Sequence, residues 1–193
     1  MNKNFKPTNQ RKNLRLPDFD YSQDGLYFVT IVTQNRVCLF GAVDNKKMIL
    51  NDVGKMIEQV CQEMPQFMSK VSLEYYVIMP NHFHGIIVIN QNLGVDLPKP
   101  LNQISVQPGH QQNEQRIPDG ITSLSSVVQR FKSLTTYRYI NGVNKSGWPR
   151  FNGRLWQRNY YEHIIRNERD YQGIVDYIIL NPQNWESDEE YRS

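Results

Sequence analysis

The chain has 193 residues, of which 39% are hydrophobic, and a formal net charge of +3. This length and composition are enough for one ordinary hydrophobic core, so a single domain is expected. Two cysteines, Cys38 and Cys61, exclude a disulfide framework and a four-cysteine zinc site. The N-terminus is polar and basic and no apolar run approaches a membrane span, which predicts a cytoplasmic protein with no membrane partner.

Charges are segregated along the chain. Lysines and arginines are frequent in the first 15 positions and again from Arg130 to Arg166. Acidic residues are concentrated between Glu186 and Glu190. Such segregation suits a chain that faces a polyanion with one surface. An ordinary solvated surface of mixed charge is the alternative that composition leaves open.

Four regions of different character are expected. Positions 1–20 predict a basic flexible arm, and positions 21–185 predict a single domain. Inside that domain, the stretch at about 91–120 is rich in Gln, Asn, Pro and Gly, which predicts a flexible insertion in which His110 is solvated. Positions 186–193 form an acidic tail.

Hydrophobic periodicity and turn residues predict the elements between the arm and the tail. They are a strand at 26–34, a helix that begins at Asn51 or Asp52 and ends at Pro65, strands at 71–79 and 82–90, a helix at 123–140 closed by Gly142, a strand at 154–161 and a helix at about 167–180. This order is the split pattern of an α+β, ferredoxin-like fold, with one antiparallel sheet, two helices on one face and an extra C-terminal helix. Cys61 falls on the apolar stripe of the first helix, so a buried, reduced thiol is expected.

Two histidines open the predicted strand at 82–90, directly after a tight turn at Pro80-Asn81. Because side chains alternate along a strand, His82 and His84 point to one face and Phe83 points to the other. Two converging imidazoles make half of a metal site. Hydrogen-bonded structural histidines are the commoner explanation for such a pair taken alone.

The last helix carries a tyrosine outside its apolar stripe. At about 100° per residue, Tyr171 falls on that stripe, whereas Tyr177 stands at the edge of a polar face, one turn before Asn181. Most helical tyrosines are amphipathic packing residues. Tyr177 is nevertheless a candidate nucleophile, because an amide oxygen and a two-histidine site accompany it.

The sequence resembles the single-tyrosine HUH transposases and, among them, the REP-associated tyrosine transposases. The matching segments are Met79-Pro80-Asn81-His82-Phe83-His84, then Leu155-Trp156-Gln157-Arg158 with Tyr161-Glu162-His163, and finally Asp176-Tyr177-Ile178-Ile179-Leu180-Asn181-Pro182. The likeness runs from about position 25 to position 182. It implies a ferredoxin-like fold, a divalent metal on His82 and His84, Tyr177 as the nucleophile, and cleavage of single-stranded DNA at hairpin-marked ends.

The sequence departs from some relatives by offering Asn181 where they have a glutamine. Asparagine is shorter by one methylene, and it precedes Pro182, which biases Asn181 away from helical geometry. Asn181 is the expected third metal ligand beside the two histidines.

The chemistry can be stated from the residues. A metal on the phosphate oxygens neutralises the charge that repels a nucleophile. Imidazoles with an amide oxygen fit Mg²⁺ or Mn²⁺. A phenol, with a pKa of about 10, attacks poorly until such contacts favour the phenolate. A 5′-phosphotyrosine would preserve the bond energy for a later 3′-hydroxyl, so strand transfer explains a tyrosine better than simple nuclease action does.

Basic and aromatic residues supply candidate DNA contacts. The expected DNA-binding residues are Arg130, Lys132, Arg154, Arg158 and His163. For His163, a hydrogen bond within the fold is slightly favoured over a phosphate contact. Trp148, Phe151 and Trp156 could stack on bases, although Trp156 in particular suits the core.

Three functions therefore remain open. The first is a metal-dependent DNA strand transferase whose partner is single-stranded DNA with a hairpin. The second is a non-catalytic, domesticated protein that binds hairpin nucleic acid, and the third is a phosphodiesterase that acts through an activated water. A homodimer is one assembly considered, with Tyr177 serving its own subunit or a neighbour.

Overall fold

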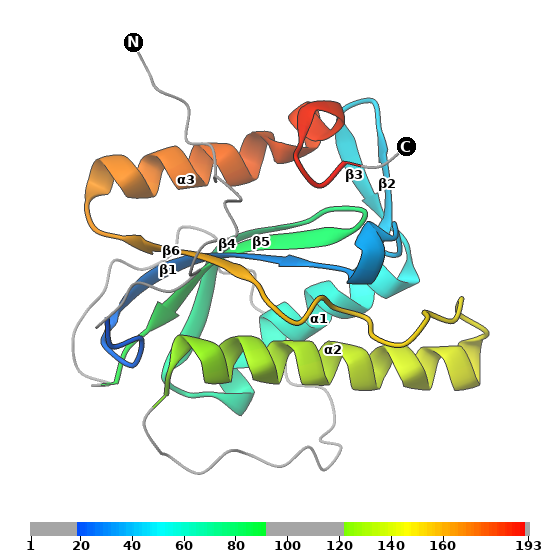
Figure 1. Ribbon diagram of the computed structural model, residues 1–193, viewed down its shortest axis with the longest axis horizontal. Coiled ribbons are helices and arrows are strands. Elements are labelled where there is room, and N and C mark those ends of the chain that lie inside the picture. Colours follow the sequence, from blue (N-terminus) through cyan, green and yellow to red (C-terminus); the bar gives the residue numbers. More distant parts are fainter. Residues whose placement is uncertain (1–18, 92–121, 192–193) are drawn as a thin grey trace.

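The computed structural model describes residues 19–91 and 122–191 and gives an α+β fold built on one four-stranded sheet (Figure 1). The predicted arm at 1–20 and the predicted insertion at about 91–120, with His110, lie almost wholly outside the described residues.

The sheet has the spatial order β4 (Val71–Ile78), β5 (His82–Ile89), β1 (Gly25–Val32) and β6 (Tyr161–Ile165). All neighbouring strands are antiparallel. Every residue of β5 is buried, as expected of a central strand covered on both faces. The paired histidines therefore belong to the most enclosed strand of the sheet.

Three helices cover the two faces of the sheet. The helices α1 (Asp52–Phe67) and α2 (Leu124–Ser146) lie on one face, and α3 (Glu168–Leu180) lies on the other (Figure 1). This arrangement confirms the ferredoxin-like α+β fold, including the extra C-terminal helix. In the described part of the chain, no helix combines the length and the apolar character that a membrane crossing requires.

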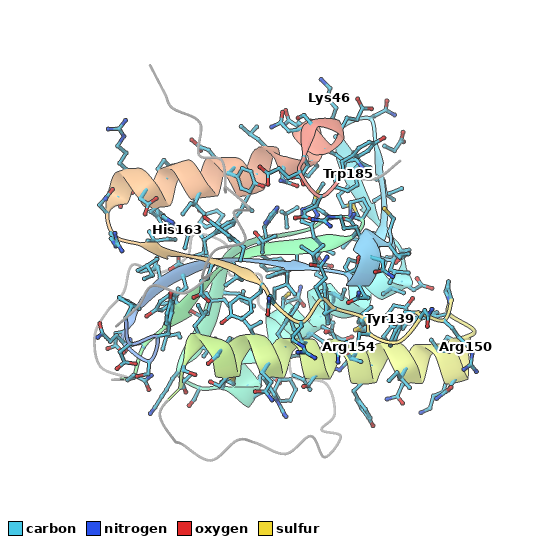
Figure 2. The ribbon with its side chains drawn as sticks, viewed as in Figure 1. Lys46, Tyr139, Arg150, Arg154, His163 and Trp185 are labelled. Carbon is cyan, nitrogen blue, oxygen red and sulfur yellow. The ribbon has the colours of Figure 1, made fainter. Side chains whose placement is uncertain are left out.

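The chain after α3 folds back against the sheet. The 3₁₀ helix η2 (Asn181–Ser187) follows α3 directly, and its Trp185 lies buried beneath it, above the strands (Figure 2). Glu190 is also buried, and its carboxylate lies 2.5 Å from Nε of Arg36. Arg36 is the last residue of the short 3₁₀ helix η1 (Gln34–Arg36). Within the expected acidic tail, Glu190 is thus buried, whereas Glu186 and Glu189 are exposed.

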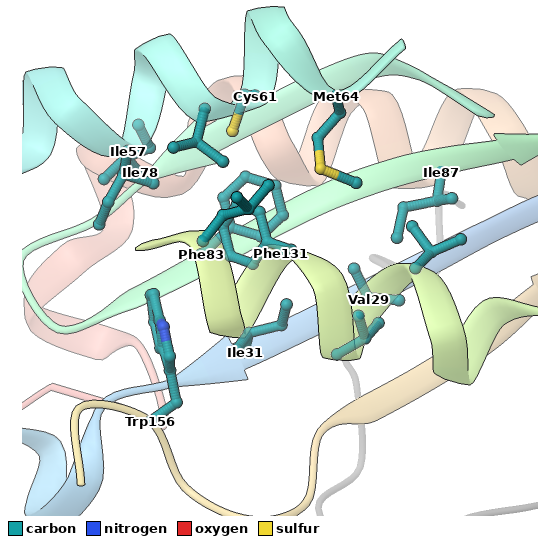
Figure 3. Packing of buried hydrophobic residues seen from close by; sticks show 14 of the residues in the cluster. Val29, Ile31, Ile57, Cys61, Met64, Ile78, Phe83, Ile87, Phe131 and Trp156 are labelled. Atoms are coloured by element: carbon teal, nitrogen blue, oxygen red, sulfur yellow. The ribbon is translucent and has the colours of Figure 1, made fainter. Parts of the chain in front are cut away.

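The larger hydrophobic core lies between the sheet and the helices α1 and α2 (Figure 3). Its side chains include Val29, Ile31, Phe83 and Ile87 from the strands, Ile57, Cys61 and Met64 from α1, and Phe131 from α2. Cys61 is a free, buried cysteine, as predicted. Trp156 also belongs to this core, and its indole N–H donates to Thr135 Oγ1 at 2.8 Å.

Polar side chains begin all three helices where the sequence predicts. Asn51 caps α1, Ser123 caps α2 and Asn167 caps α3, each through a side-chain oxygen that accepts a backbone N–H of the first turn. The end of α1 lies slightly beyond the prediction, because Pro65 is accommodated and the helix continues to Phe67.

The predicted end of α2 at Gly142 is wrong. The helix continues to Ser146, and Gly147 caps it in the left-handed conformation with φ of 67°. Gly142 lies inside the helix and is buried, because the ring of Trp148 packs directly against its Cα. The glycine therefore permits close packing and does not end the helix.

The predicted strand at 154–161 is also misplaced. The β6 strand begins only at Tyr161, and the preceding segment is irregular except for a single bridge between Trp156 and Thr33. Leu155 and Trp156 are neighbours in the sequence and both are buried in the core. Their apolar side chains therefore do not follow the alternation of a strand.

A two-stranded hairpin that the sequence did not predict lies between η1 and α1. It pairs β2 (Gly41–Asp44) with β3 (Lys47–Leu50). Asn45 and Lys46 form its turn with φ of 47° and 62°, which is the geometry of a type I′ hairpin turn.

Candidate metal and nucleophile site

The two strand histidines form the centre of the candidate site. His82 and His84 leave β5 on the α3 face, whereas Phe83 between them enters the core on the other face. Their ring centroids are 4.4 Å apart, and their exposed fractions are 0% and 1%. The alternation expected from the sequence therefore brings both imidazoles to one point.

Each imidazole is held by a partner on its Nδ1 atom. His82 Nδ1 lies 2.9 Å from Asn81 Oδ1, and His84 Nδ1 lies 2.8 Å from Thr30 Oγ1 on β1. Such bonds fix the ring orientation and leave Nε2 for another role. His84 Nε2 faces the hydroxyl of Tyr177, and His82 Nε2 has no hydrogen-bond partner of normal geometry in the described structure.

The helix α3 brings its tyrosine to the same place. The Tyr177 hydroxyl lies 3.2 Å from His84 Nε2, and its ring meets the edge of Phe28. Ile174, Val175 and Ile178 anchor α3 on Phe28 and Ile86 of the sheet. The juxtaposition of phenol and imidazoles expected from the sequence is therefore present within one chain.

Tyr171 occupies a different environment on the same helix. Its hydroxyl donates to Glu74 Oε2 at 2.8 Å, away from the histidines. The helical angles thus separate the two tyrosines correctly, with Tyr171 in packing and Tyr177 at the candidate site.

The pKa values of the site follow from its burial. Burial lowers the pKa of His82 to about 4, an effect that Asp188 and Asn181 oppose. Burial and the neighbouring His82 lower the pKa of His84 well below its ordinary value. Both rings are therefore neutral at neutral pH, the form in which imidazole binds metals.

The phenol is shifted in the opposite sense. Burial first, and then the charges of Asp188, Glu189 and Glu190, raise the pKa of Tyr177 above its ordinary value. In this environment the hydroxyl stays protonated, so a positive charge near it is needed before it can act as a nucleophile.

Asn181 presents an oxygen to the site. Its Oδ1 is buried without a hydrogen-bond partner, while its amide group donates to Asp188 Oδ2 at 3.1 Å. The expectation that Pro182 keeps Asn181 out of helical geometry is wrong, because its φ and ψ are −56° and −45°. The chain accommodates the proline by passing from α3 directly into η2.

Asp188 is a site residue that the sequence did not indicate. One carboxylate oxygen of Asp188 and one nitrogen of each histidine lie within 4.8 Å of one another. No periodicity marks this aspartate, since it follows a 3₁₀ helix and stands in an acidic stretch. The pair of histidines therefore has two candidate oxygen partners.

This donor set suits a divalent cation. The unpartnered Nε2 of His82 and Oδ1 of Asn181 are buried acceptor atoms, and a bound cation would satisfy both lone pairs. Neutral imidazoles with amide or carboxylate oxygens are common ligands of Mn²⁺ and, less often, Mg²⁺. The residues present thus fit a metal, whose identity they leave open.

Two of the expected DNA-binding residues have partners within the chain. Lys132 Nζ donates to the carbonyl oxygens of Gln157, Arg158 and Asn159 at 2.9, 3.2 and 3.2 Å, and burial lowers its pKa to about 8. The guanidinium of Arg130 lies 5.4 Å from the ring centroid of Phe67 on α1. Both contacts hold the fold together.

The other three differ in exposure. Arg154 and Arg158 are exposed. Figure 2 shows Arg154 on the segment that runs beside α2. His163 on β6 bonds to both carboxylate oxygens of Asp170 on α3, at 3.0 and 2.9 Å, which ties the helix to the sheet edge. This hydrogen bond is the structural role that the sequence slightly favoured.

The paired strand histidines beside a helical tyrosine, on a ferredoxin-like sheet, are the arrangement that the resemblance to the single-tyrosine HUH class of proteins implies. Comparison with known proteins agrees with this class, although no family model matches the chain. An uncharacterized protein of Haemophilus influenzae is 39% identical over 184 residues, which cover 94% of this chain and 93% of that protein.

Two named relatives identify the family. A putative REP-associated tyrosine transposase of Haemophilus influenzae is 24% identical over 84% of this chain and 73% of its own length. The REP-associated tyrosine transposase of Escherichia coli K12 is 31% identical over 51% of each chain. The chain belongs to the family of REP-associated tyrosine transposases.

A solved structure shares the fold. It is a REP-associated tyrosine transposase bound to a REP hairpin, which superposes with a TM-score of 0.52 at 18% identity and covers 88% of this chain and 72% of that chain. At this level of identity the likeness concerns the fold alone.

Proposed function

We propose that the protein is a transposase that cleaves and rejoins single-stranded DNA at hairpin-marked ends through a 5′-phosphotyrosine on Tyr177. One observation carries the proposal: the Tyr177 hydroxyl lies 3.2 Å from His84 Nε2, beside a buried set of metal-binding atoms. Related proteins named as transposases, one of them solved with a REP hairpin, support the same function.

His82 and His84, with Asn181 or Asp188, would hold a divalent metal, either Mg²⁺ or Mn²⁺. When bound, the metal would supply positive charge that neutralises the phosphate oxygens and favours the phenolate. Asn81 and Thr30 hold the two rings in place, so the site is preorganised.

Tyr177 would carry the covalent step. A bond forms between its phenolic oxygen and the phosphorus, and the bond from phosphorus to the 3′-oxygen breaks. The phenolic proton is lost and the departing 3′-oxygen gains one, so that a free 3′-hydroxyl results. Attack by a 3′-hydroxyl on the phosphotyrosine reverses these changes and rejoins the strand. Because Tyr177 and the histidines come from one chain, the step needs no second copy, although a homodimer is compatible with it.

Arg154 and Arg158 are the proposed phosphate contacts, because both are exposed on one segment. Arg130, Lys132 and His163 would act indirectly, through the packing and hydrogen bonds that shape this surface. We place the activity in the cytoplasm.

The test incubates the protein with a labelled single-stranded DNA hairpin and Mn²⁺. We expect a covalent adduct that denaturing electrophoresis detects and that Tyr177→Phe abolishes. The substitution removes the contact of the hydroxyl with His84, and the free energy of unfolding should fall by about 1.5 kcal/mol for that contact.

Tyr171→Phe is the matched control, because Tyr171 lies on the same helix but bonds to Glu74. It should retain the adduct. Persistence of the adduct in Tyr177→Phe would reassign the nucleophile, and hairpin cleavage without any adduct in that variant would point to an activated water.

A non-catalytic hairpin-binding protein is the second candidate. The near-zero exposure of both histidines favours it, since no phosphate can reach them in this conformation. Hairpin binding that is unchanged by EDTA, with no cleavage in Mn²⁺ or Mg²⁺, would support this function and contradict the transferase.

A further inference from the structure

The turn before the paired histidines contains a buried side chain that the proposed chemistry does not use directly. Asn81 joins β4 to β5, and asparagine is common in turns because of its backbone preferences. A turn residue chosen for its backbone is normally exposed, but Asn81 has an exposed fraction of 0%. Its side chain therefore has a role inside the molecule.

The amide of Asn81 is held in one orientation by two acceptors. Its Nδ2 group donates one hydrogen to the carbonyl of Arg36 at 3.1 Å and the other to the carbonyl of Glu190 at 2.7 Å. If the amide were flipped, Oδ1 would face two carbonyl oxygens, and neither could donate a hydrogen. The oxygen must therefore point the other way.

On that other side lies the imidazole of His82. Its Nδ1 atom is 2.9 Å from Asn81 Oδ1. Because a carbonyl oxygen can only accept, the hydrogen of this bond belongs to Nδ1. In a neutral ring the lone pair is then on Nε2, which is the buried atom without a partner.

The two acceptors are themselves fixed. Arg36 adopts the left-handed conformation, with φ of 56°, and its side chain pairs with the buried carboxylate of Glu190 at 2.5 Å. The same two residues thus bond to each other and offer their carbonyls to Asn81. This closed set of contacts joins η1, the β4–β5 turn and the segment after η2.

We propose that Asn81 is a positioning residue that holds His82 in the tautomer with Nδ1 protonated and Nε2 free for a metal. The proposal deepens the proposed function, since it concerns the same metal site. Thr30 holds Nδ1 of His84 in the same way. Its hydroxyl can donate as well as accept, so it does not fix which nitrogen of His84 carries the hydrogen.

The first test needs no variant and no metal. Long-range ¹H–¹⁵N correlation spectra of the metal-free protein at neutral pH distinguish a protonated ring nitrogen from an unprotonated one. We expect His82 to show a protonated Nδ1 and an unprotonated Nε2. The opposite pattern, or an averaged one, would overturn the proposal even if every Asn81 variant failed to fold.

The second test separates positioning from folding. Asn81→Ala and Asn81→Asp remove the donor pair that orients the side chain, and Thr30→Val serves as the matched control on the other histidine. We expect the Asn81 variants to change the ring-nitrogen pattern of His82 alone, and Thr30→Val to change that of His84 alone.

Mn²⁺ affinity, followed by the electron paramagnetic resonance signal of free Mn²⁺, should fall about 10- to 100-fold in Asn81→Ala. An unchanged His82 pattern with unchanged Mn²⁺ affinity in a folded Asn81→Ala would refute the positioning role. Neither readout involves DNA, so a failure of strand transfer would leave this result standing, and the reverse also holds.

Discussion

Asn181 and Asp188, at the two ends of η2, offer oxygen atoms to the paired histidines. The amide oxygen of Asn181 is buried and unpartnered, whereas Asp188 brings a full negative charge. Charge strengthens oxygen ligation of a hard divalent cation, while an unpartnered amide adds a ligand at little desolvation cost. Both side chains are therefore expected to contribute, with the carboxylate giving the larger share.

We expect Asp188→Asn to weaken Mn²⁺ binding by about 10-fold or more, and Asn181→Ala to weaken it by a smaller factor. Titration of the metal-free protein with Mn²⁺ measures both. Glu189→Gln is the control, because Glu189 is an exposed neighbour of the same charge. Equal affinities in Asp188→Asn and the wild type would leave Asn181 as the oxygen ligand, as the sequence predicted.

The two histidines should also make stability depend on pH. The pKa of His82 is lowered from 6.5 to about 4 in the folded protein, and that of His84 is lowered as well. Between about pH 4 and pH 6.5, these histidines are protonated in the unfolded chain but not in the folded chain. The free energy of unfolding should therefore be highest above pH 6.5 and fall as the pH drops toward 4, by up to about 1.4 kcal/mol per pH unit for each ring.

Urea unfolding in EDTA at several pH values tests this dependence. Replacing both rings, as His82→Gln with His84→Gln, should flatten the dependence between pH 6.5 and 5, where carboxylates contribute less. A wild-type curve that is flat across this range would contradict the neutral, buried state of the rings.

At the scale of residues, the sequence predicted those members of the site that lie on regular elements. Strand alternation places His82 and His84 together, and helical angles separate Tyr177 from Tyr171. Asp188 could not be found in this way, because it lies just beyond η2, outside any helix or strand whose period assigns side chains to a face. Its position depends on how the chain folds back after α3.

Among the elements, α2 shows how a glycine can mislead. The sequence predicts a helix end at Gly142, but this glycine lies inside α2 and allows the ring of Trp148 to pack against the helix backbone. The helix starts predicted at Asn51 or Asp52, at Ser123 and at about Asn167 are confirmed, and each start has a side-chain cap, which is a local contact between a side chain and a nearby N–H. Close packing depends on a residue that arrives from another direction, which local patterns do not record.

Gly142→Ala tests this explanation. Alanine favours a helix by about 1 kcal/mol over glycine, but its Cβ would overlap the Trp148 ring and force it outward. We expect a net loss of about 1–3 kcal/mol in the free energy of unfolding. Asn144→Ala, at an exposed position of the same helix, should be neutral or slightly stabilising. A stabilised Gly142→Ala would show that the ring moves freely.

The strand that was misplaced illustrates a further limit. The segment before β6 contains Leu155 and Trp156, whose burial reflects two separate contacts with the core. Lys132 on α2 donates to the next three carbonyl oxygens, and backbone contacts with Val32 and Thr33 also hold the segment. Tertiary contacts, and not propensity, determine the conformation of this segment.

Across the whole molecule, the site is closed by η2 and the segment that follows it. Trp185 lies 5.8 Å from His82 between ring centroids, and the ion pair of Glu190 with Arg36 secures the cover. A phosphate can reach the histidines only if this cover opens. The structure therefore represents a closed state of the proposed enzyme.

Glu190→Gln should favour opening, because it removes the ion pair but keeps the backbone carbonyl that Asn81 uses. We expect adduct formation with the DNA hairpin to be several-fold faster, together with faster amide exchange in residues 185–191. Glu186→Gln, an exposed change within η2, is the control. A slower reaction with faster exchange would indicate that the cover belongs to the active arrangement.

One feature of β5 bears on how such a protein can be re-engineered. Phe83 is packed in the core and stands between His82 and His84 in the sequence of β5, so any change in core volume is transmitted to both imidazoles at once. Arg154 and Arg158 are exposed and stand outside that core, although Leu155 and Trp156 between them belong to it. A library aimed at new hairpin preferences should therefore diversify Arg154 and Arg158 and spare the strand, whose randomisation would damage folding and chemistry together.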